Sequence, residues 1–381
     1  MKNKTIVYVN YSPYENVGKI TDFLIENFRY VFVFSIGFHN LGVSNQKNWL
    51  LVYSNGVLLE EKPFYHMPVP RSLVFLLLPV RSILNLIQIF WIVLFLNNKY
   101  KRMDYYLSVN AYTICIGMIL KKFNFVKKVV FWVWDYYPPK HSNSIVILIR
   151  WIYWQLDKIA TFSDRVIYLN KRLIKIRKDN GLILPKNNRV IIPIGTDLYQ
   201  GITRKPAKVR LGFLGVLKQD QGLDLLFDNT QELKDSFPNI EIEIIGPGPN
   251  EQYFRDRAKS SCVPYTFYGW VPEKKVEQIL SRCTIGIAPY SPEESSVAYY
   301  GDPGKIKSYL SACLPIITTN VFDFSRELEL SGAGIVIDYN NPKSLLKAIR
   351  DITDNYKRFT ENVVKLNKRF YYKNLYAGMF K

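Results

Sequence analysis

The stretch IGIAPYSPEESSVAYYGDPGKIKSYLSACLPIITT, residues 285–319, decides the fold of the second half of this chain. It contains a short apolar strand, a polar loop, a helix beginning near Gly304, and a second apolar strand from Pro315. Strand, helix and strand in this order are typical of a parallel α/β sheet. Gly304 and Lys305 put amide N–H groups and a positive charge at the helix start, where a phosphate can bind.

The same alternation covers the 381 residues and restarts once, at the strand Val209–Leu214. The polar, proline-containing segment 203–208 precedes the restart and predicts a hinge. We therefore expect an α/β protein of two Rossmann-like domains facing a cleft. The first domain is predicted to cover residues 1–200 and the second residues 201–355; the tail 356–381 is expected to pack back on the first domain.

Two glycine turns follow strands in the second half, at Gly212–Gly215 and at Ile244–Pro249. Glycines there let backbone N–H groups approach a phosphate, and the loop before residue 304 supplies carboxylates for sugar hydroxyls. A nucleotide-diphosphate ligand is therefore expected at these strand ends. The residues predicted to bind it are Gly215, Lys218, Gly246, Gly248, Tyr290, Glu294, Asp302, Gly304 and Lys305.

At these residues the sequence resembles the GT-B fold glycosyltransferases of the family-4-like group, the glycosyl transferases group 1. The resemblance rests on GVLKQDQGLDLL from Gly215, on Ile244–Pro249, on Phe267–Pro289 and on Pro303–Thr318. In the first half it continues at Val133–Pro138, Ser163–Ile167 and Ile192–Asp197.

The resemblance also shows departures. The family's paired glutamates fall at Tyr300 and Ser308, and its donor-phosphate Arg and Lys fall at Val216 and Gln221. Its cleft histidine falls at Trp134, which leaves Asp135 as the nearest ionisable group.

The resemblance implies transfer of a sugar from a nucleotide-diphosphate sugar, the co-substrate, to an acceptor hydroxyl, usually with retention of configuration. No cofactor and no metal ion are expected. Asp135 and Asp302 are the candidate catalytic groups, and Gly18, Trp134, Asp135 and Tyr136 are predicted on the acceptor side. Two alternatives remain: a sugar-nucleotide epimerase of the same fold, and a non-catalytic homologue that acts as a partner protein.

The charge distribution predicts where the protein works. Residues 1–200 hold 26 Lys and Arg against 11 Asp and Glu, a net of +15, and the remaining 25 and 21 give residues 201–381 a net of +4. Such a basic half is expected to face a polyanion. With no recognised nucleic-acid module, we expect no nucleic acid and favour an anionic membrane with a lipid-linked glycan acceptor.

Two basic clusters flank the aromatic segment Ile145–Phe162, an arrangement that suits attachment to anionic lipid. They are Lys121, Lys122, Lys127 and Lys128, and Lys171, Arg172, Lys175, Arg177 and Lys178. Leu73–Leu96 is apolar but interrupted by polar residues and predicts a buried or interfacial helix rather than a membrane span. The amino terminus resembles no signal peptide, so the expected location is cytoplasmic, peripheral on the inner face of the cell membrane.

Overall fold

A computed structural model describes residues 1–10, 16–37, 47–69, 73–137, 141–183, 185, 188–198, 208–292 and 297–381. The chain divides into two compact units. Unit 1 consists of Met1–Pro193 and Lys373–Lys381, and unit 2 consists of Ile194–Tyr372. The break after Pro193 lies seven residues before the boundary expected from the sequence, and most of the predicted hinge, 203–207, lies outside the described residues.

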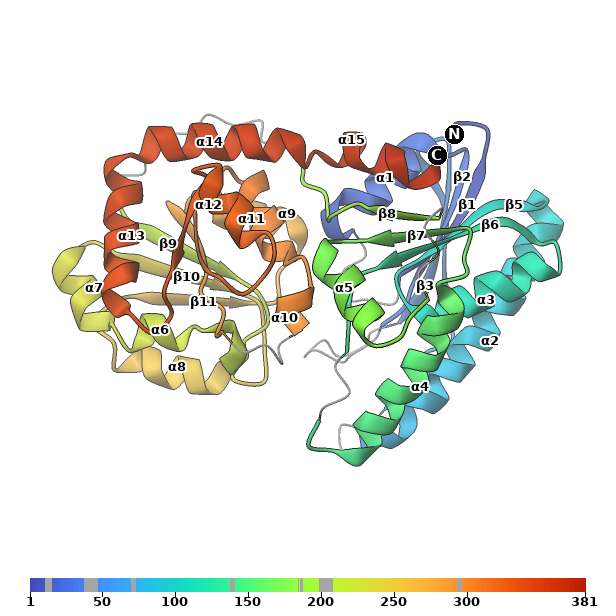
Figure 1. Ribbon diagram of the computed structural model, residues 1–381, viewed down its shortest axis with the longest axis horizontal. Helices are drawn as coiled ribbons and strands as arrows, with labels where there is room; N and C mark the ends of the chain where they lie inside the picture. The colour runs from blue at the N-terminus through green and yellow to red at the C-terminus, as the bar shows by residue number, and fades with distance from the viewer. Residues whose placement is uncertain are drawn as a thin grey trace. The chain divides into compact units, whose positions relative to one another are not determined.

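Unit 1 contains one sheet of eight strands in the order β4-β3-β2-β1-β5-β6-β7-β8. The strands are β1 (Thr5–Asn10), β2 (Tyr30–Ser35), β3 (Asn48–Ser54), β4 (Val57–Phe64), β5 (Met103–Ser108), β6 (Val126–Val133), β7 (Arg165–Tyr168) and β8 (Arg189–Ile191). Six of these strands, in the order β2-β1-β5-β6-β7-β8, pair in parallel. Helices α1 (Ile20–Asn27), α2 (Val74–Tyr100), α3 (Ala111–Lys122), α4 (Ser144–Ala160) and α5 (Lys171–Asp179) connect them (Figure 1).

The antiparallel hairpin β3–β4 at the edge of this sheet was not expected from the sequence. Its turn is Asn55–Gly56, and both residues have a positive φ, 48° and 88°. Asn-Gly is the dipeptide that two-residue hairpin turns prefer, because both central residues must adopt this backbone conformation. The signal was therefore present in the sequence.

Unit 2 contains six parallel strands in the order β11-β10-β9-β12-β13-β14. They are β9 (Arg210–Leu214), β10 (Glu241–Ile245), β11 (Tyr265–Gly269), β12 (Ile285–Ala288), β13 (Ile316–Thr319) and β14 (Gly334–Ile337). Numbered along the unit this order is 3-2-1-4-5-6, that of a Rossmann fold, and the strand order reverses between β9 and β12. The predicted α/β class with two Rossmann-like domains is confirmed.

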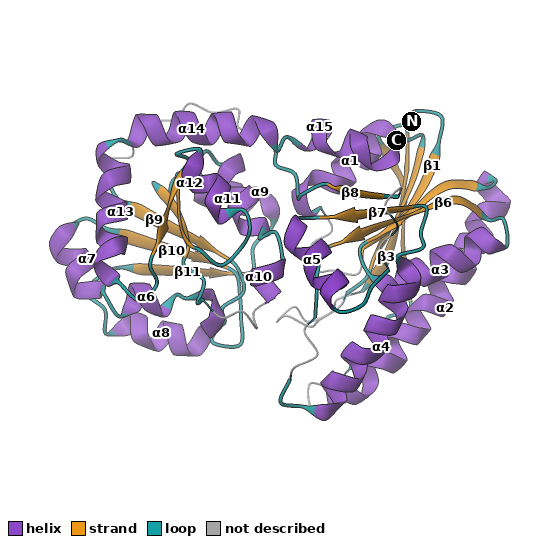
Figure 2. Cartoon of the chain, in the orientation of Figure 1, coloured by secondary structure: helices purple, strands orange, loops and turns teal. Residues whose placement is uncertain are grey.

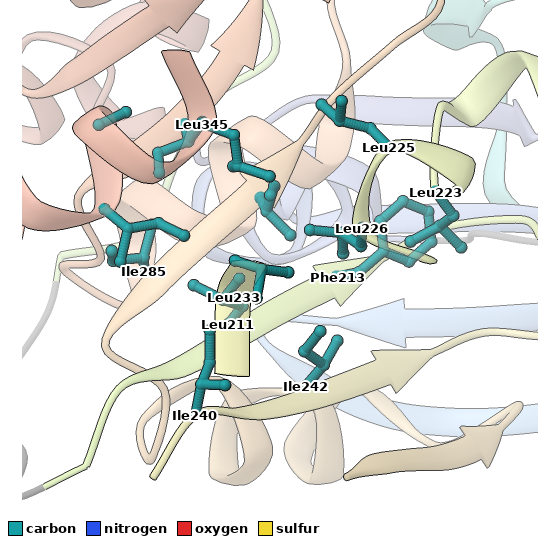
Figure 3. Close-up of a cluster of buried hydrophobic side chains, with 14 of the residues drawn as sticks. Leu211, Phe213, Leu223, Leu225, Leu226, Leu233, Ile240, Ile242, Ile285 and Leu345 are labelled. Atoms are coloured by element: carbon teal, nitrogen blue, oxygen red, sulfur yellow. The ribbon is translucent and has the colours of Figure 1, made fainter. Parts of the chain in front are cut away.

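The helices of unit 2 cover this sheet (Figure 2). They are α6 (Asp224–Phe227), α7 (Thr230–Ser236), α8 (Glu251–Lys259), α9 (Glu273–Leu280), α10 (Val297–Tyr300), α11 (Gly304–Ser311), α12 (Ser325–Leu330), α13 (Pro342–Asp354) and α14 (Tyr356–Arg369). Leu211 and Phe213 of β9 and Ile242 of β10 pack with Leu226 and Leu345 in one apolar core (Figure 3). The buried core holds the central strands in register, so that their carboxyl ends stand at a common edge.

The tail predicted to pack on the first domain is divided between the units. Helix α14 buries Val363 and Leu366 within unit 2, whereas residues 373–381 belong to unit 1. There the Tyr376 hydroxyl donates to the Gly18 carbonyl at 2.8 Å, and the Arg165 guanidinium donates to the carbonyls of Gly378 and Lys381 at 3.0 and 2.9 Å. The end of the chain is therefore part of the first unit's structure.

Candidate functional site

The candidate site of unit 2 lies at the carboxyl ends of β9 and β12, where the strand order reverses. Ligands of open α/β sheets bind at such a switch point. Tyr309 of α11 holds the two strands together: its hydroxyl accepts from the Leu214 amide at 2.8 Å and donates to the Ile287 carbonyl at 2.9 Å. Gly286 gives the Tyr309 ring its space, because a Cβ there would lie 2.5 Å from it.

Lys305 lies one helical turn before Tyr309 and is therefore carried to the same strand ends. Its ammonium donates to the Gln221 Oε1 at 2.8 Å and lies over the rings of Phe213 and Tyr290, 4.2 and 4.5 Å from their centroids. It also borders the first glycine turn, since a Cβ on Gly215 would lie 2.9 Å from Nζ. The structure thus brings together three residues predicted from the sequence: Gly215, Tyr290 and Lys305.

Burial governs the charge of Lys305. The side chain is only 8% exposed, and its desolvation lowers the pKa to about 7, although Asp220 opposes this shift. Burial also raises the pKa of the Tyr290 hydroxyl. An ammonium in this setting gains from an anionic ligand, because a second charge within about 4–6 Å restores the cationic form.

The glycine turns have a packing role. A Cβ on Gly246 would lie 2.2 Å from the Gly215 carbonyl oxygen, one on Gly248 would lie 2.3 Å from the Leu217 backbone, and one on Gly222 would lie 1.7 Å from the Pro289 carbonyl oxygen. The amides of Gly215 and Gly246 already donate to Ile245 and Gly269, at 2.9 and 2.8 Å. Glycine at 246 and 248 is therefore required by the close approach of two backbones; contact of these residues with a donor stays a prediction.

Asp302 lies just before α11, but both its carboxylate oxygens serve contacts inside unit 2. Oδ2 accepts from the Ile194 amide at 2.9 Å, and Oδ1 is 3.3 Å from the Lys307 ammonium. Burial raises its pKa, while Lys307 opposes the shift. Lys307 in turn lies over Phe324 and Phe370, so the pair ties α11 to the segment at Ile194 and to the end of α14. These contacts support a structural role for Asp302, and none of them points to a catalytic role.

The other residues predicted to bind the donor are placed differently. Lys218 is exposed beside the first turn, Gly304 is the first residue of α11, and Glu294 lies outside the described residues. Within the described ranges, His, Cys, Asp and Glu side chains form no group of three that could hold a metal ion. The expectation of transfer without a metal stays a prediction.

The residues predicted on the acceptor side lie in unit 1, after β6 and β1. Asp135 is half-buried and accepts from the Tyr137 hydroxyl at 3.2 Å; burial raises its pKa. Among the described residues the buried Trp134 Nε1–H has no hydrogen-bond partner, while its ring meets Trp132 edge-on. Tyr136 packs on Trp154, and Gly18, whose φ is 62°, is bound by Tyr376. Trp134, Asp135 and Tyr136 thus share one segment at the end of β6, and Gly18 follows β1.

Sequence reasoning missed Gln221 and Tyr309. Gln221 holds the Lys305 ammonium, and Tyr309 sets the position of the helix that carries it. The spacing of Lys305 and Tyr309, four residues apart on a predicted helix, was the available signal for Tyr309. Gln221 comes from a different loop; the family resemblance placed it at a donor-phosphate position, but its contact with Lys305 could not be read from the sequence.

Residues 208–355 match the family described as Glycosyl transferases group 1. Unit 2 carries the domain of the group 1 glycosyl transferases. A search of curated proteins found no match. The matched residues span all six strands of the sheet and helix α11, so the candidate site lies entirely within this glycosyltransferase domain.

Solved structures extend the likeness to both units. Sucrose-phosphate synthase from Thermosynechococcus elongatus superposes with a TM-score of 0.67 at 12% identity, covering 99% of this chain and 96% of that one. Anabaena Alr3699/HepE in complex with UDP gives 0.63 at 14%, covering 100% and 98%. WaaG, a glycosyltransferase involved in lipopolysaccharide biosynthesis, gives 0.61 at 13%, covering 98% of each chain. The fold is therefore that of the GT-B glycosyltransferases.

The structure shows where the residues lie at which this glycosyltransferase domain departs from the family pattern. Ser308, at one glutamate position, donates its hydroxyl to the Gly304 carbonyl at 3.3 Å inside α11. Tyr300, at the other, ends α10 and meets Tyr299 edge-on. Because the family's phosphate-binding positions are Val216 and Gln221 here, the buried positive charge at this turn comes from Lys305.

Proposed function

We propose that this glycosyltransferase moves a sugar from a nucleotide-diphosphate sugar to a lipid-linked glycan acceptor, in surface polysaccharide or glycolipid synthesis, without a metal ion. The single observation that carries the donor part is the buried Lys305 ammonium at the switch point of unit 2. It lies beside the Gly215 turn and in the first turn of α11. A cation and a helix amino terminus at one place together favour a diphosphate.

The donor chemistry follows from these groups. The leaving nucleoside diphosphate gains negative charge as the glycosidic bond to the sugar breaks. A prealigned ammonium and the positive end of the α11 helix dipole stabilise that charge at little reorganisation cost. HepE, whose solved structures contain UDP and UDP-glucose, supports a uridine diphosphate sugar as the first donor to test.

The lipid-linked acceptor and the inner membrane face are supported by the net +15 of residues 1–200. They are also supported by one helix in unit 1, Leu76–Tyr100, that is long and apolar enough to cross a membrane by length and composition. The WaaG structure, named for lipopolysaccharide synthesis, supports the same acceptor class. An epimerase would need no lipid acceptor, and a non-catalytic homologue would not turn over a donor.

Isothermal titration of the full chain with UDP, GDP and their sugars tests the proposal. Lys305→Met should weaken binding of the preferred nucleotide roughly tenfold or more, because a charge-assisted contact is worth about 1.5–3 kcal/mol. Lys259→Met, at an exposed lysine of α8, is the control and should bind as the wild type does. Equal affinity of the folded Lys305→Met variant would remove Lys305 from the site.

Turnover separates the three candidate functions. A glycosyltransferase should release the nucleoside diphosphate faster when membrane extract supplies an acceptor. Interconversion of two nucleotide sugars without extract would establish the epimerase instead. Binding with no turnover in either condition would support a non-catalytic partner protein.

A further inference from the structure

Helix α2 buries two polar side chains in its central part. Arg81 and Asn85, only 2% and 1% exposed, lie on the buried face together with Ile89 and Val93. The Asn48 side-chain amide donates to the Asn85 Oδ1 at 3.0 Å, which fastens this face to β3. A helix of a water-soluble domain normally turns its apolar stripe inward and its charges outward.

The outer face of the same helix is apolar. Its exposed residues recur every three or four positions and form what we call the α2 stripe, consisting of Leu76, Val80, Ile83, Ile87, Trp91 and Phe95. Trp91 and Phe95 are 64% and 65% exposed, and only 22% of the most apolar window of this helix is buried. Exposing this many apolar side chains to water costs free energy, whereas placing them in an apolar environment is favourable.

The neighbouring helix α4 continues the pattern. Helices α2, α3 and α4 contact one another and lie side by side (Figure 2). On α4 the exposed apolar residues include Ile145, Leu148, Trp151 and Ile152. Two adjacent helices of unit 1 therefore present large apolar side chains to their surroundings.

Basic residues gather where these three helices end. Arg102 donates to the Val126 carbonyl, Lys127 pairs with Asp104 at 2.6 Å and Lys121 with Asp164 at 2.5 Å, so the ends of α2, α3 and α4 are held at one edge of the sheet. The aromatic residues Phe123 and Phe162 are 61% and 60% exposed there. The exposed basic residues at this edge include Lys101, Arg102, Lys121, Lys122, Lys128 and Lys158.

The structure corrects part of the two basic clusters that were predicted, with the aromatic segment between them, to contact the membrane. Arg177, placed in the second cluster, is 1% exposed and forms an ion pair with Asp157. Its guanidinium also lies against the rings of Trp154 and Tyr168. Lys121 and Lys127 have carboxylate partners as well, so part of the predicted free charge is balanced inside unit 1.

We propose that the α2 stripe lies in the surface of an anionic phospholipid bilayer, parallel to it, with the adjacent exposed face of α4. The basic edge then faces lipid headgroups, and Trp91 and Trp151 occupy the region where aromatic rings favour the membrane interface. The helix does not cross the bilayer, because its inner face is held inside unit 1: Asn85 is hydrogen-bonded to Asn48 of β3, and Ile89 is fully buried. A second copy of the chain would bring another strongly basic surface to this one, whereas anionic lipid has the opposite charge.

This inference sharpens the membrane part of the proposed function by assigning the surface, and it does not depend on the donor site. The test is co-sedimentation of the full chain with vesicles of phosphatidylcholine and phosphatidylglycerol, and with phosphatidylcholine alone. The variant Ile83→Gln, Ile87→Gln, Trp91→Gln should lower the partition coefficient roughly tenfold or more, because each side chain loses its burial in the interface. The control Trp270→Gln, Leu330→Gln removes two apolar residues of unit 2 that are 57% and 77% exposed, and it should leave binding unchanged.

A second measurement reports the depth of insertion. Lipids brominated on their acyl chains should quench the fluorescence of the wild type, and Trp91→Phe should lose a large part of that quenching. Wild-type binding by the folded triple variant would overturn the proposal. A wild-type dimer that the triple variant dissociates in lipid-free solution would also overturn it and make the stripe an interface between copies. UDP titration of the same variants keeps the two proposals apart, since loss of lipid binding should leave donor affinity unchanged.

Discussion

The two units treat their apolar residues differently. Among the described residues, 26 large hydrophobic side chains are exposed, and 23 of them belong to unit 1 and 3 to unit 2, namely Tyr253, Trp270 and Leu330. Helix α13 of unit 2 turns Leu345, Ile349 and Ile352 into the core, as a helix in water should, whereas α2 of unit 1 exposes its apolar side chains. The exposed apolar side chains are thus concentrated in unit 1, as the proposed contact of this unit with a membrane surface requires.

The two units also differ in where they bury a charged side chain. Unit 2 buries Lys305 at the carboxyl edge of its sheet, where the ammonium donates to Gln221, and unit 1 buries Arg81 on the inner face of α2. A buried charge costs free energy unless it is paired. Lys305 is thus expected to reduce the stability of unit 2 in exchange for donor binding.

The largest expected difference between helices α13 and α2 is in how much a substitution lowers the free energy of unfolding. Ile349→Ala in α13 should lower the free energy of unfolding by about 2–5 kcal/mol, because it leaves a cavity in a fully buried core. Urea unfolding followed by circular dichroism measures this change. A loss below about 1 kcal/mol would show that the core of unit 2 can close around the missing side chain.

The second effect concerns the buried charge. Lys305→Met should raise the thermal stability of unit 2 by about 1 kcal/mol or more near pH 6, since it removes a desolvated ammonium. The pKa of Lys305 is about 7 in the folded chain, whereas an unperturbed lysine has a pKa of 10.5, so the folded state binds fewer protons than the unfolded state between these values. The wild type therefore gains stability as the pH rises from about 7 towards 10.5, and the advantage of the variant should shrink over that range.

Melting curves of the two proteins at pH 6, 8 and 9.5 test this dependence. Lys259→Met serves as the control, because that lysine is exposed on α8. An advantage of Lys305→Met that is constant with pH would mean that lost packing or hydrogen bonding, rather than the buried charge, separates the two proteins.

The smallest expected effect lies on α2. Ile83→Ala, at a side chain 58% exposed, should change the free energy of unfolding in lipid-free solution by no more than about 0.5 kcal/mol. Measured beside Ile349→Ala under the same conditions, it compares an outward with an inward isoleucine. A loss comparable to that of Ile349→Ala would show that the α2 stripe is covered by protein in solution.

Much of the fold was predictable because it depends on local patterns. The alternation of apolar strands and helices predicted two Rossmann-like domains, and the chain's glycine turns predicted where the strands end. The Asn55–Gly56 dipeptide was an equally clear signal for a hairpin turn, but the hairpin was not predicted. Among the predicted site residues, Gly215, Tyr290 and Lys305 proved to be neighbours, since all three follow or face strands that meet at one edge of the sheet.

The sequence by itself determined the fold class, the basic first half and the lysine at the start of α11, since each depends on residue type and short-range spacing. Only the tertiary structure decided what these residues contact. Asp302 pairs with Lys307 and the Ile194 amide, Arg177 is buried against Asp157, and α2 turns its apolar side outward. The physical reason is that burial and partners depend on which distant segments pack together, and a helical period places apolar residues on one face without saying whether that face meets the core or the surroundings.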